Sequence, residues 1–228
     1  MNKISIIIPV LNEERIIKNS LEILQYIQER GHELIVVDGG SIDKTGDIAK
    51  KYTSNVISCE KGRALQMNAG AKVAKGDILI FLHIDTILSP CDFRQLWYAI
   101  NDDDKAYRWG FFPLRLSSPK MIYRIIEFFI NKKSHFTGIA TGDQILFMSK
   151  KLFQHVGGFD SLCLMEDLAM CKKMKKISRP TLIDATVTTS SRRWENNGVY
   201  ITIIQMWMLR LAYYLGVNTR TLARKYYG

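Results

Sequence analysis

Several common sequence features are missing from this chain. Its four cysteines form no CxxC pair, which argues against a structural zinc site and favours reduced thiols in a cytoplasmic protein. The chain has no GxGxxG fingerprint, which argues against a Rossmann dehydrogenase, and no GxxxxGK(S/T) motif, which excludes a P-loop. Because no internal repeat, low-complexity segment or linker interrupts it, we expect one domain over residues 1–228.

Long apolar runs are also lacking. The run at residues 4–10 is short, and charged residues follow it without a small-residue cleavage site, so it predicts a first strand rather than a signal peptide. Residues 199–215 are apolar, but a bilayer span needs about 20 apolar residues. Arg210 also lies deep inside this run. We therefore expect no membrane-spanning helix.

Acidic residues are few relative to basic ones. The chain has 22 Asp and Glu against 32 Lys and Arg, which gives a formal net charge of +10. This excess indicates a negatively charged partner such as nucleic acid, an anionic membrane or a phosphorylated ligand. The basic residues are dispersed, which argues against nucleic acid, and the apolar content of 47% is typical of a globular protein.

Strand and helix patterns alternate through the first 88 residues. Apolar runs predict strands at 4–10, 33–37, 55–59 and 77–86. Helical patterns between them are expected to begin at Asn12, as a helix cap, and near residues 43 and 63. Such alternation predicts an α/β fold with a doubly wound, mostly parallel sheet flanked by helices. We expect residues 1–88 to form a nucleotide-binding half.

Residues 89–228 are expected to form an acceptor-side half with a less regular pattern. Helices are predicted at 92–100, 121–130, 150–156, 166–176 and 199–215, strands at 105–116, 145–148 and 181–188, and a loop at 134–143. The C-terminal helices are predicted to be amphipathic. Two hypotheses stay open for helices 121–130 and 199–215: they lie on anionic lipid, or they pack on the sheet or between two copies of the chain.

Three carboxylates follow predicted parallel strands: Glu13, Asp38 and Asp85. Ligands of open α/β sheets bind outside the carboxyl ends of the strands, so these acids are candidates for ligand contact. For Asp85, a simple role in a turn is an equal alternative. Arg63 is the first residue of a predicted helix. Its guanidinium is expected either to bind a phosphate or to be exposed to solvent.

The ordered set of motifs resembles glycosyltransferase family 2, whose members have the GT-A fold. The motifs lie at residues 9–14, 36–45, 62–68, 82–86, 157–159 and 165–167. Further matches at 191–194, 209–211 and 215–217 are similar to the bacterial subgroup called radical-SAM/selenodomain-associated transferase 2. The resemblance covers nearly the whole chain in the expected order.

The resemblance implies a nucleotide-diphospho-sugar donor, preferably a UDP-sugar, and a divalent cation, Mg²⁺ or Mn²⁺. Residues at the family's nucleotide-binding positions are Pro9, Leu11, Glu13, Asp38, Arg63, Gln66 and His83. Asp85 is the implied metal ligand, as the last residue of the family's DxD motif. His83 stands where that motif has its first Asp. Its ring is expected either to bind Mn²⁺ or to point into the fold, and we favour the second.

Asp167, preceded by Glu166, falls at the family's catalytic base and implies inverting transfer to an acceptor hydroxyl. Favourable charge in the first helical turn is the alternative explanation for both acids. The paired guanidiniums of Arg192 and Arg193 are expected to bind the diphosphate, with Trp194 stacking on a sugar or closing the site; a plain contact with an anionic surface is the alternative. The resemblance places the acceptor at Gly142, Asp143 and Gln144. Other hypotheses are a non-catalytic binder of nucleic acid or anionic lipid, and a nucleotidyltransferase on a related fold.

Overall fold

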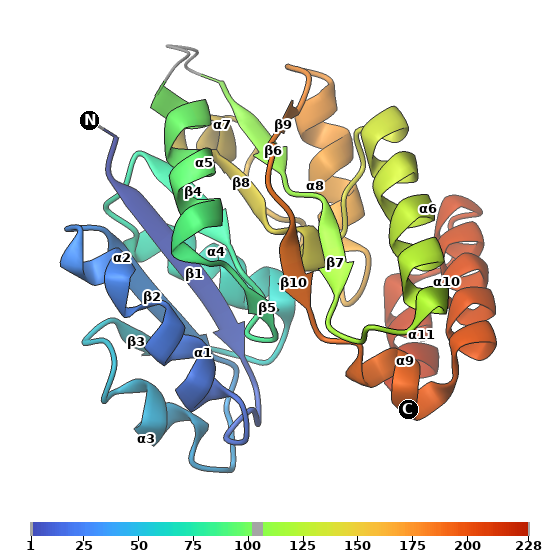
Figure 1. Ribbon diagram of the computed structural model, residues 1–228, viewed down its shortest axis with the longest axis horizontal. Helices are drawn as coiled ribbons and strands as arrows, with labels where there is room; N and C mark the ends of the chain where they lie inside the picture. The colour runs from blue at the N-terminus through green and yellow to red at the C-terminus, as the bar shows by residue number, and fades with distance from the viewer. Residues whose placement is uncertain (1, 102–106, 228) are drawn as a thin grey trace.

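The computed structural model describes residues 2–101 and 107–227, and a seven-stranded sheet forms its centre (Figure 1). The strand order is β3-β2-β1-β4-β8-β6-β9. The first four strands are mutually parallel: β1 (Ile4–Val10), β2 (Glu33–Asp38), β3 (Val56–Ser58) and β4 (Ile78–Phe81). The next strand, β8 (Leu146–Ser149), is antiparallel to both β4 and β6 (Trp109–Phe111), and β9 (Thr181–Leu182) is parallel to β6. The predicted α/β class with a mostly parallel sheet is confirmed.

Helices cover both faces of this sheet and bury it. One face packs against α1 (Ile17–Ile23), α2 (Gln25–Glu29), α3 (Thr45–Ala49) and α5 (Pro90–Asn101). The other face packs against α4 (Arg63–Val73), α7 (Lys150–His155) and α8 (Glu166–Lys175). Side chains alternate across β1, since Ile6 and Ile8 belong to the first core and Ile7 to the second. All seven residues of β1 are buried, as expected for a central parallel strand.

A second group of elements lies beside the sheet (Figure 1). A small sheet has the order β5 (Thr86–Ile87), β10 (Val187–Thr189), β7 (Leu114–Leu116). The helices of this group are α6 (Met121–Thr137), α9 (Arg192–Asn197), α10 (Val199–Tyr214) and α11 (Thr219–Tyr227). The pairing of Thr189 with Thr86 brings the start of α9 next to the loop that joins β4 to β5.

The first helix does not begin at Asn12, so that prediction is wrong. Asn12 has a φ of 54° and lies in a loop, and α1 begins at Ile17. The Asn12 side-chain oxygen instead accepts a hydrogen bond from the Ile42 backbone amide, and the Asn12 backbone amide donates to the Ser41 hydroxyl. Asn12 therefore joins the loops that follow β1 and β2, because its side chain satisfies backbone groups that have no partner in a strand.

Other boundaries also differ from the predictions. The strand expected at 77–86 ends at Phe81, and the loop expected at 134–143 begins only after Thr137, where Gly138 adopts a φ of 60°. The strand expected at 181–188 is two short strands. The predicted extended segment 105–116 divides into β6 and β7, and its first residues lie outside the described residues. Helix α10 carries apolar side chains on its outer surface as well as toward the protein, so the amphipathic pattern expected there is not confirmed.

Close packing of α4 on the sheet brings its N-terminus to the ends of β1 and β2. A Cβ atom on Gly70 would lie 2.4 Å from Ile7 Cγ2 and 3.0 Å from Val37 Cγ2. Only glycine allows this approach without displacing core side chains.

Gln66, on the same helix, fastens the two strand ends. Its side-chain nitrogen donates to the carbonyl oxygens of Val10 and Val37, each at 2.9 Å, and only 4% of the residue is exposed. Gln66, predicted to face a nucleotide, therefore acts here as a support beneath the loops that follow β1 and β2.

We predict that Gln66→Leu destabilises the fold. Leucine has a similar volume but removes the side-chain donor that two buried carbonyl groups share, and the Val10 carbonyl keeps its bond from the Gly39 amide. Each lost hydrogen bond contributes about 0.5–1.5 kcal/mol, so the free energy of unfolding from urea titration is expected to fall by about 1–3 kcal/mol. Gln154→Leu, on the exposed surface of α7, is the control and is expected to be neutral. Equal stability of the two variants would contradict the bridging role.

Candidate active site

The candidate site lies at one edge of the large sheet, where β1, β2 and β4 end. Parallel strands share this edge at their carboxyl ends, so the loops carrying Glu13, Asp38 and Asp85 meet there. β8 is antiparallel to β4, with Leu146 opposite Phe81, so β8 begins at the edge where β4 ends. The short 3-10 helix η1 (Gly142–Gln144), which precedes β8, is thereby placed beside the loop after β4.

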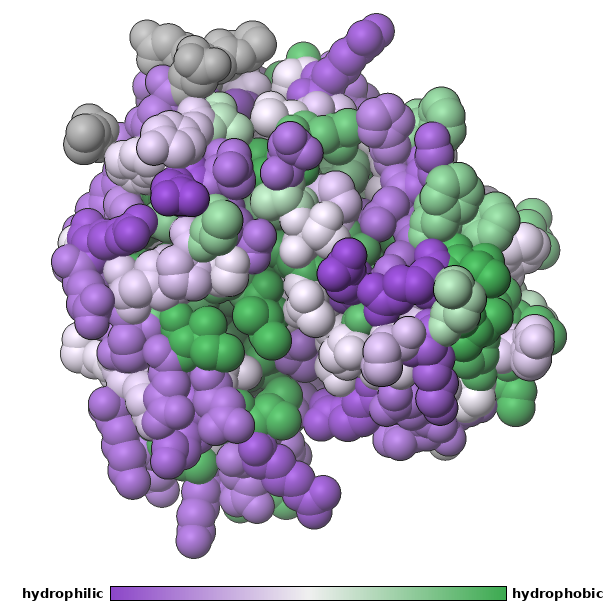
Figure 2. Space-filling model, viewed as in Figure 1, coloured by the Kyte–Doolittle hydropathy of each residue, from purple (hydrophilic) through white to green (hydrophobic). Residues whose placement is uncertain are grey.

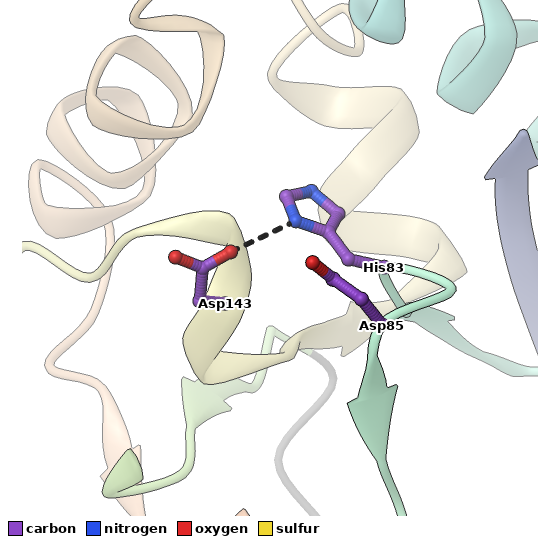
Figure 3. A group of neighbouring side chains, drawn as sticks. All are labelled: His83, Asp85 and Asp143. Atoms are coloured by element: carbon purple, nitrogen blue, oxygen red, sulfur yellow. Dashed lines mark hydrogen bonds and ion pairs between the residues drawn. The ribbon is translucent and has the colours of Figure 1, made fainter. Parts of the chain in front are cut away.

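Three side chains converge at this junction (Figure 3). His83 and Asp85 come from the loop after β4, and Asp143 comes from η1. The His83 Nδ1 atom lies 3.2 Å from a carboxylate oxygen of Asp143. One ligand atom from each of the three residues lies within 4.8 Å of the others.

The His83–Asp143 contact changes the proton affinity of both groups. Burial and the charge of Arg63 act to lower the pKa of His83, but the hydrogen bond and negative charge of Asp143 outweigh them and raise it. Desolvation acts to raise the pKa of Asp143, but the bond from His83 and the charges of His83 and Arg63 lower it. An ionised carboxylate only accepts hydrogen bonds, so Nδ1 carries the proton of this contact.

Gly142 connects this group to the predicted catalytic base. Its amide donates to Asp167 Oδ2 at 2.9 Å. A Cβ atom at position 142 would lie 2.2 Å from His83 Cε1 and 2.8 Å from Asp167 Oδ2. The residue at 142 must therefore lack a side chain for His83 and Asp167 to approach its backbone from two sides.

Glu166 and Asp167 form the first turn of α8 and are both buried. Burial raises the pKa of Glu166, and the charge of Asp167 raises it further. Burial also raises the pKa of Asp167, against the opposing charges of His83 and Arg63. The positive charge of Arg63 also acts to lower the pKa of Glu13, Asp85 and Asp143. Its guanidinium therefore acts on five carboxylates of the site.

The predicted nucleoside-binding residues occupy the neighbouring loops. Asp38 accepts hydrogen bonds from the amide and hydroxyl of Ser41, which holds its carboxylate at the end of β2. Glu13 lies 3.7 Å from Arg192, and burial raises its pKa although the Arg192 charge opposes this. Pro9 is buried inside β1, and Leu11 is half-buried just after it.

The three residues predicted at the diphosphate have different surroundings. Arg192 is exposed and reaches Glu13. Arg193 donates to the Tyr226 carbonyl at 3.2 Å, and its guanidinium lies 3.5 Å from the centre of the Tyr226 ring. Trp194 packs beside Leu114, Leu116 and Tyr123, so α11 and the small sheet hold these two side chains away from the open surface.

The residues predicted at the acceptor lie in η1, but they differ in exposure. Gln144 is fully buried and bonds Ser134, Thr141 and Phe112, so it supports η1 from within the protein. Asp143 is about half exposed and belongs to the group with His83 and Asp85.

Two features escaped sequence reasoning. Asp143 was not expected near Asp85, because 58 residues separate them and only the antiparallel pairing of β8 brings them together. Arg210 interrupts the apolar run of α10, and burial lowers its pKa, although the charges of Tyr214 and Asp143 act in the opposite direction. An isolated charge in an apolar helix was the available signal that this face of α10 turns toward the site.

The donor set fits a hard divalent cation. Two carboxylates from different segments suit Mg²⁺ or Mn²⁺, and an imidazole suits Mn²⁺ better than Mg²⁺. The Nε2 atom of His83 is buried without a hydrogen-bond partner, which leaves one nitrogen of the ring uncommitted.

Comparison with known proteins finds relatives of similar sequence, solved structures of similar fold and one matching family model. A poly(ribitol-phosphate) beta-glucosyltransferase of Bacillus spizizenii is 31% identical to this chain over 114 residues, which cover 46% of this chain and 18% of that protein. This chain thus spans less than a fifth of that relative's length.

Two solved structures share the fold at lower identity. S. aureus TarS 1–349 in complex with UDP-GlcNAc has a TM-score of 0.65 and 18% identity, over 82% of this chain and 58% of that one. The mannosyltransferase PcManGT from Pyrobaculum calidifontis, in complex with GDP-Man and Mn²⁺, has a TM-score of 0.64 and 19% identity, over 92% of this chain and 61% of that one. The family model described as glycosyl transferase family 2 matches residues 5–156, two thirds of the sequence. This chain belongs to glycosyl transferase family 2.

Proposed function

We propose that this protein transfers a sugar from a nucleotide-diphospho-sugar to an acceptor hydroxyl with inversion at the anomeric carbon. One observation carries the proposal: Gly142 joins a candidate cation group, His83, Asp85 and Asp143, to a separate buried carboxylate, Asp167. An inverting displacement needs two such groups on either side of one sugar, since the acceptor loses a proton while the diphosphate leaves.

Asp167 is the proposed base. As the acceptor oxygen bonds to the anomeric carbon, the bond from that carbon to the diphosphate oxygen breaks, and the acceptor proton passes to the Asp167 carboxylate. Burial raises the pKa of Asp167, which makes its ionised form a stronger base. The Gly142 amide holds one oxygen of the Asp167 carboxylate in place. Glu166 lies next to Asp167, and repulsion between two negative charges makes it unfavourable for both carboxyl groups to lose their protons.

Glu13, Asp38 and Arg63 are proposed to hold the nucleoside and its first phosphate. Their loops are joined by Asn12 and supported by Gln66, which keeps this side rigid. We favour a UDP-sugar. Arg192 is proposed to leave Glu13 and bind the diphosphate, because its contact at 3.7 Å is long and the Arg192 side chain is exposed, so the contact costs little to break.

Asp85, Asp143 and His83 would hold the divalent cation. Bound there, the cation would neutralise the charge that develops on the leaving diphosphate. The protein contributes the fixed positions of the two carboxylates, through η1 and the loop after β4.

The finer sequence predictions stay proposals. They are the division at residue 88, the radical-SAM/selenodomain-associated transferase 2 subgroup, a lipid-linked acceptor, a cytoplasmic location and a homodimer. A nucleotidyltransferase is less well supported, because Asn12, Glu13 and Glu14 stand after β1 where that class has a basic glycine-rich loop. A non-catalytic binder of nucleic acid or anionic lipid gives no account of this site, since its crowded carboxylates repel phosphate groups unless a cation is present.

We predict that Asp167→Asn abolishes transfer but retains donor binding. The amide cannot accept the acceptor proton, so the rate is expected to fall by about 10²–10⁴-fold. A panel of UDP- and GDP-sugars first identifies the donor of the wild-type protein. Calorimetry with that donor is then expected to give a Kd for Asp167→Asn within about twofold of the wild-type value. Asp47→Asn, on the exposed surface of α3, is the control. Full activity of Asp167→Asn would remove this residue from the proposed role.

We predict that Asp85→Asn and Asp143→Asn each weaken Mn²⁺ binding in the presence of UDP by about tenfold or more. Each change removes one anionic ligand atom from the group. Electron paramagnetic resonance of free Mn²⁺ measures the affinity without turnover. If only Asp85→Asn weakens binding, Asp143 has no part in the cation site.

We predict that Glu166→Gln stabilises the protein at alkaline pH. The raised pKa means that the folded state binds the proton more tightly than the unfolded chain, whose Glu titrates near 4.5. Stability is therefore lost as pH rises above 4.5, and the neutral amide avoids this loss. Urea unfolding in EDTA is expected to show a gain of about 1 kcal/mol or more at about pH 8, and none near about pH 4.

Glu60→Gln, on the surface, is the matched control and is expected to change neither value. A Glu166→Gln variant less stable than wild type at both pH values would show that the carboxylate is held ionised by the fold.

A further inference from the structure

Helix α10 exposes a stripe of large apolar side chains. Tyr200, Ile204, Trp207, Met208 and Leu211 recur at helical spacing, and each is more than half exposed, with Trp207 at 71%. The opposite side of α10 packs on the protein through Leu209, which contacts the cluster of Leu164, Met165 and Leu168. Arg210, the only charged residue of α10, is half-buried near Asp143.

Helix α6 adds a second exposed stripe, formed by Met121, Ile125, Phe128, Phe129 and Phe136. The inner sides of the two helices share one cluster, in which Ile122, Ile126 and Ile130 of α6 lie with Val199 and Ile203 of α10. The stripes therefore flank one seam, and Figure 2 shows apolar surface on this side of the molecule, over α6 and α10. We call the two stripes together the α6–α10 face.

The exposed charges on α6, α10 and α11 have one sign. Lys132 lies 5.7 Å and 5.8 Å from the ring centres of Phe128 and Phe136, within the α6 stripe. Arg220, Arg224 and Lys225 are exposed on α11, which packs on α10. The sequences of α6, α10 and α11 contain one acid, Glu127, which is buried and bonded to Leu116 and Arg124.

We propose that the α6–α10 face docks on an anionic lipid surface. Apolar and aromatic side chains interleaved with Lys and Arg match the boundary between lipid headgroups and acyl chains, where Trp and Tyr are favoured. A symmetric pair of copies joined through this face would bring Lys132 and the α11 cations of both copies together with no exposed acid on these helices to offset them. Among the described residues, no helix combines the length and apolarity needed to cross a bilayer.

Docking would set the candidate site close to the lipid surface. Leu209 belongs to the same apolar cluster as Met165 and Leu168, which flank Glu166 and Asp167. The inner side of α10 thus packs against the segment that carries the site, and its outer side is the docking stripe. The further consequence, an acceptor hydroxyl carried on a lipid, rests on the proposed function.

Vesicle flotation of the purified full chain, without donor or metal, tests the docking. We expect wild type to float with vesicles of phosphatidylglycerol and phosphatidylcholine but not with phosphatidylcholine alone. Raising the salt from about 0.1 M to about 1 M is expected to weaken binding, because the Debye length shrinks from about 10 Å to about 3 Å. Combined Ile204→Gln, Trp207→Gln and Met208→Gln is expected to lower the partition coefficient by about tenfold or more.

Matched variants separate the face from general effects. Arg220→Gln with Arg224→Gln and Lys225→Gln is expected to lose the preference for anionic vesicles, while Lys50→Gln with Lys51→Gln and Lys72→Gln keeps it at equal net charge. Tyr98→Gln, an exposed aromatic change on α5, is expected to float like wild type.

Two results would overturn the proposal. One is wild-type protein that stays with the soluble fraction at low salt. The other is a dimer in analytical ultracentrifugation that the α10 triple variant dissociates without any change in flotation. Asp167→Asn is expected to float normally, so failure of lipid docking and failure of sugar transfer are distinguishable.

Discussion

The antiparallel pairing of β8 with β4 is the constraint on which the site depends. Four parallel strands bring the loops with Glu13, Asp38 and Asp85 to one edge, but these loops alone hold no base and only one candidate metal carboxylate. Because β8 runs in the opposite direction, its beginning lies at the same edge, and η1 delivers Asp143 and Gly142 there. The Gly142 amide then holds Asp167 of α8. One change of strand direction thus brings segments far apart in the chain to the same edge of the sheet.

The site concentrates negative charge more than the basic composition suggests. Glu13, Asp85, Glu166 and Asp167 all have raised pKa values, first because burial removes water from their ionised forms. Arg63 opposes this for each of them, and Asp143 is further kept ionised by His83. Such crowding of buried like charges is unfavourable for folding, and perturbed carboxylates of this kind cluster at functional sites. Under the proposed function, a bound cation would offset this cost.

Particular residues show where sequence reasoning worked and where it did not. The end of β2 at Asp38 was predictable, since an apolar run buried on both faces ends abruptly there at a polar residue. The strand expected to reach Asp85 ends at Phe81 instead, so Asp85 lies in the loop that follows β4. Asn12 was predicted as a helix cap but instead joins two loops at a positive φ, a conformation that residue type alone does not reveal. Gln66 and Gln144 were predicted to face ligands, yet both are buried beneath the loops, where their amides satisfy backbone carbonyl groups.

The sequence by itself determined the α/β pattern, the order of the strands and helices in the first half, and the set of polar residues that follow the strands. These features depend on local periodicity and on the chemistry of single residues. Only the tertiary structure decided that Asp143 joins His83 and Asp85, that Arg210 turns toward the site, and that α6 and α10 leave their apolar stripes on the surface. The physical reason is that strand direction and helix rotation are set by contacts between segments far apart in the chain, which no local pattern contains.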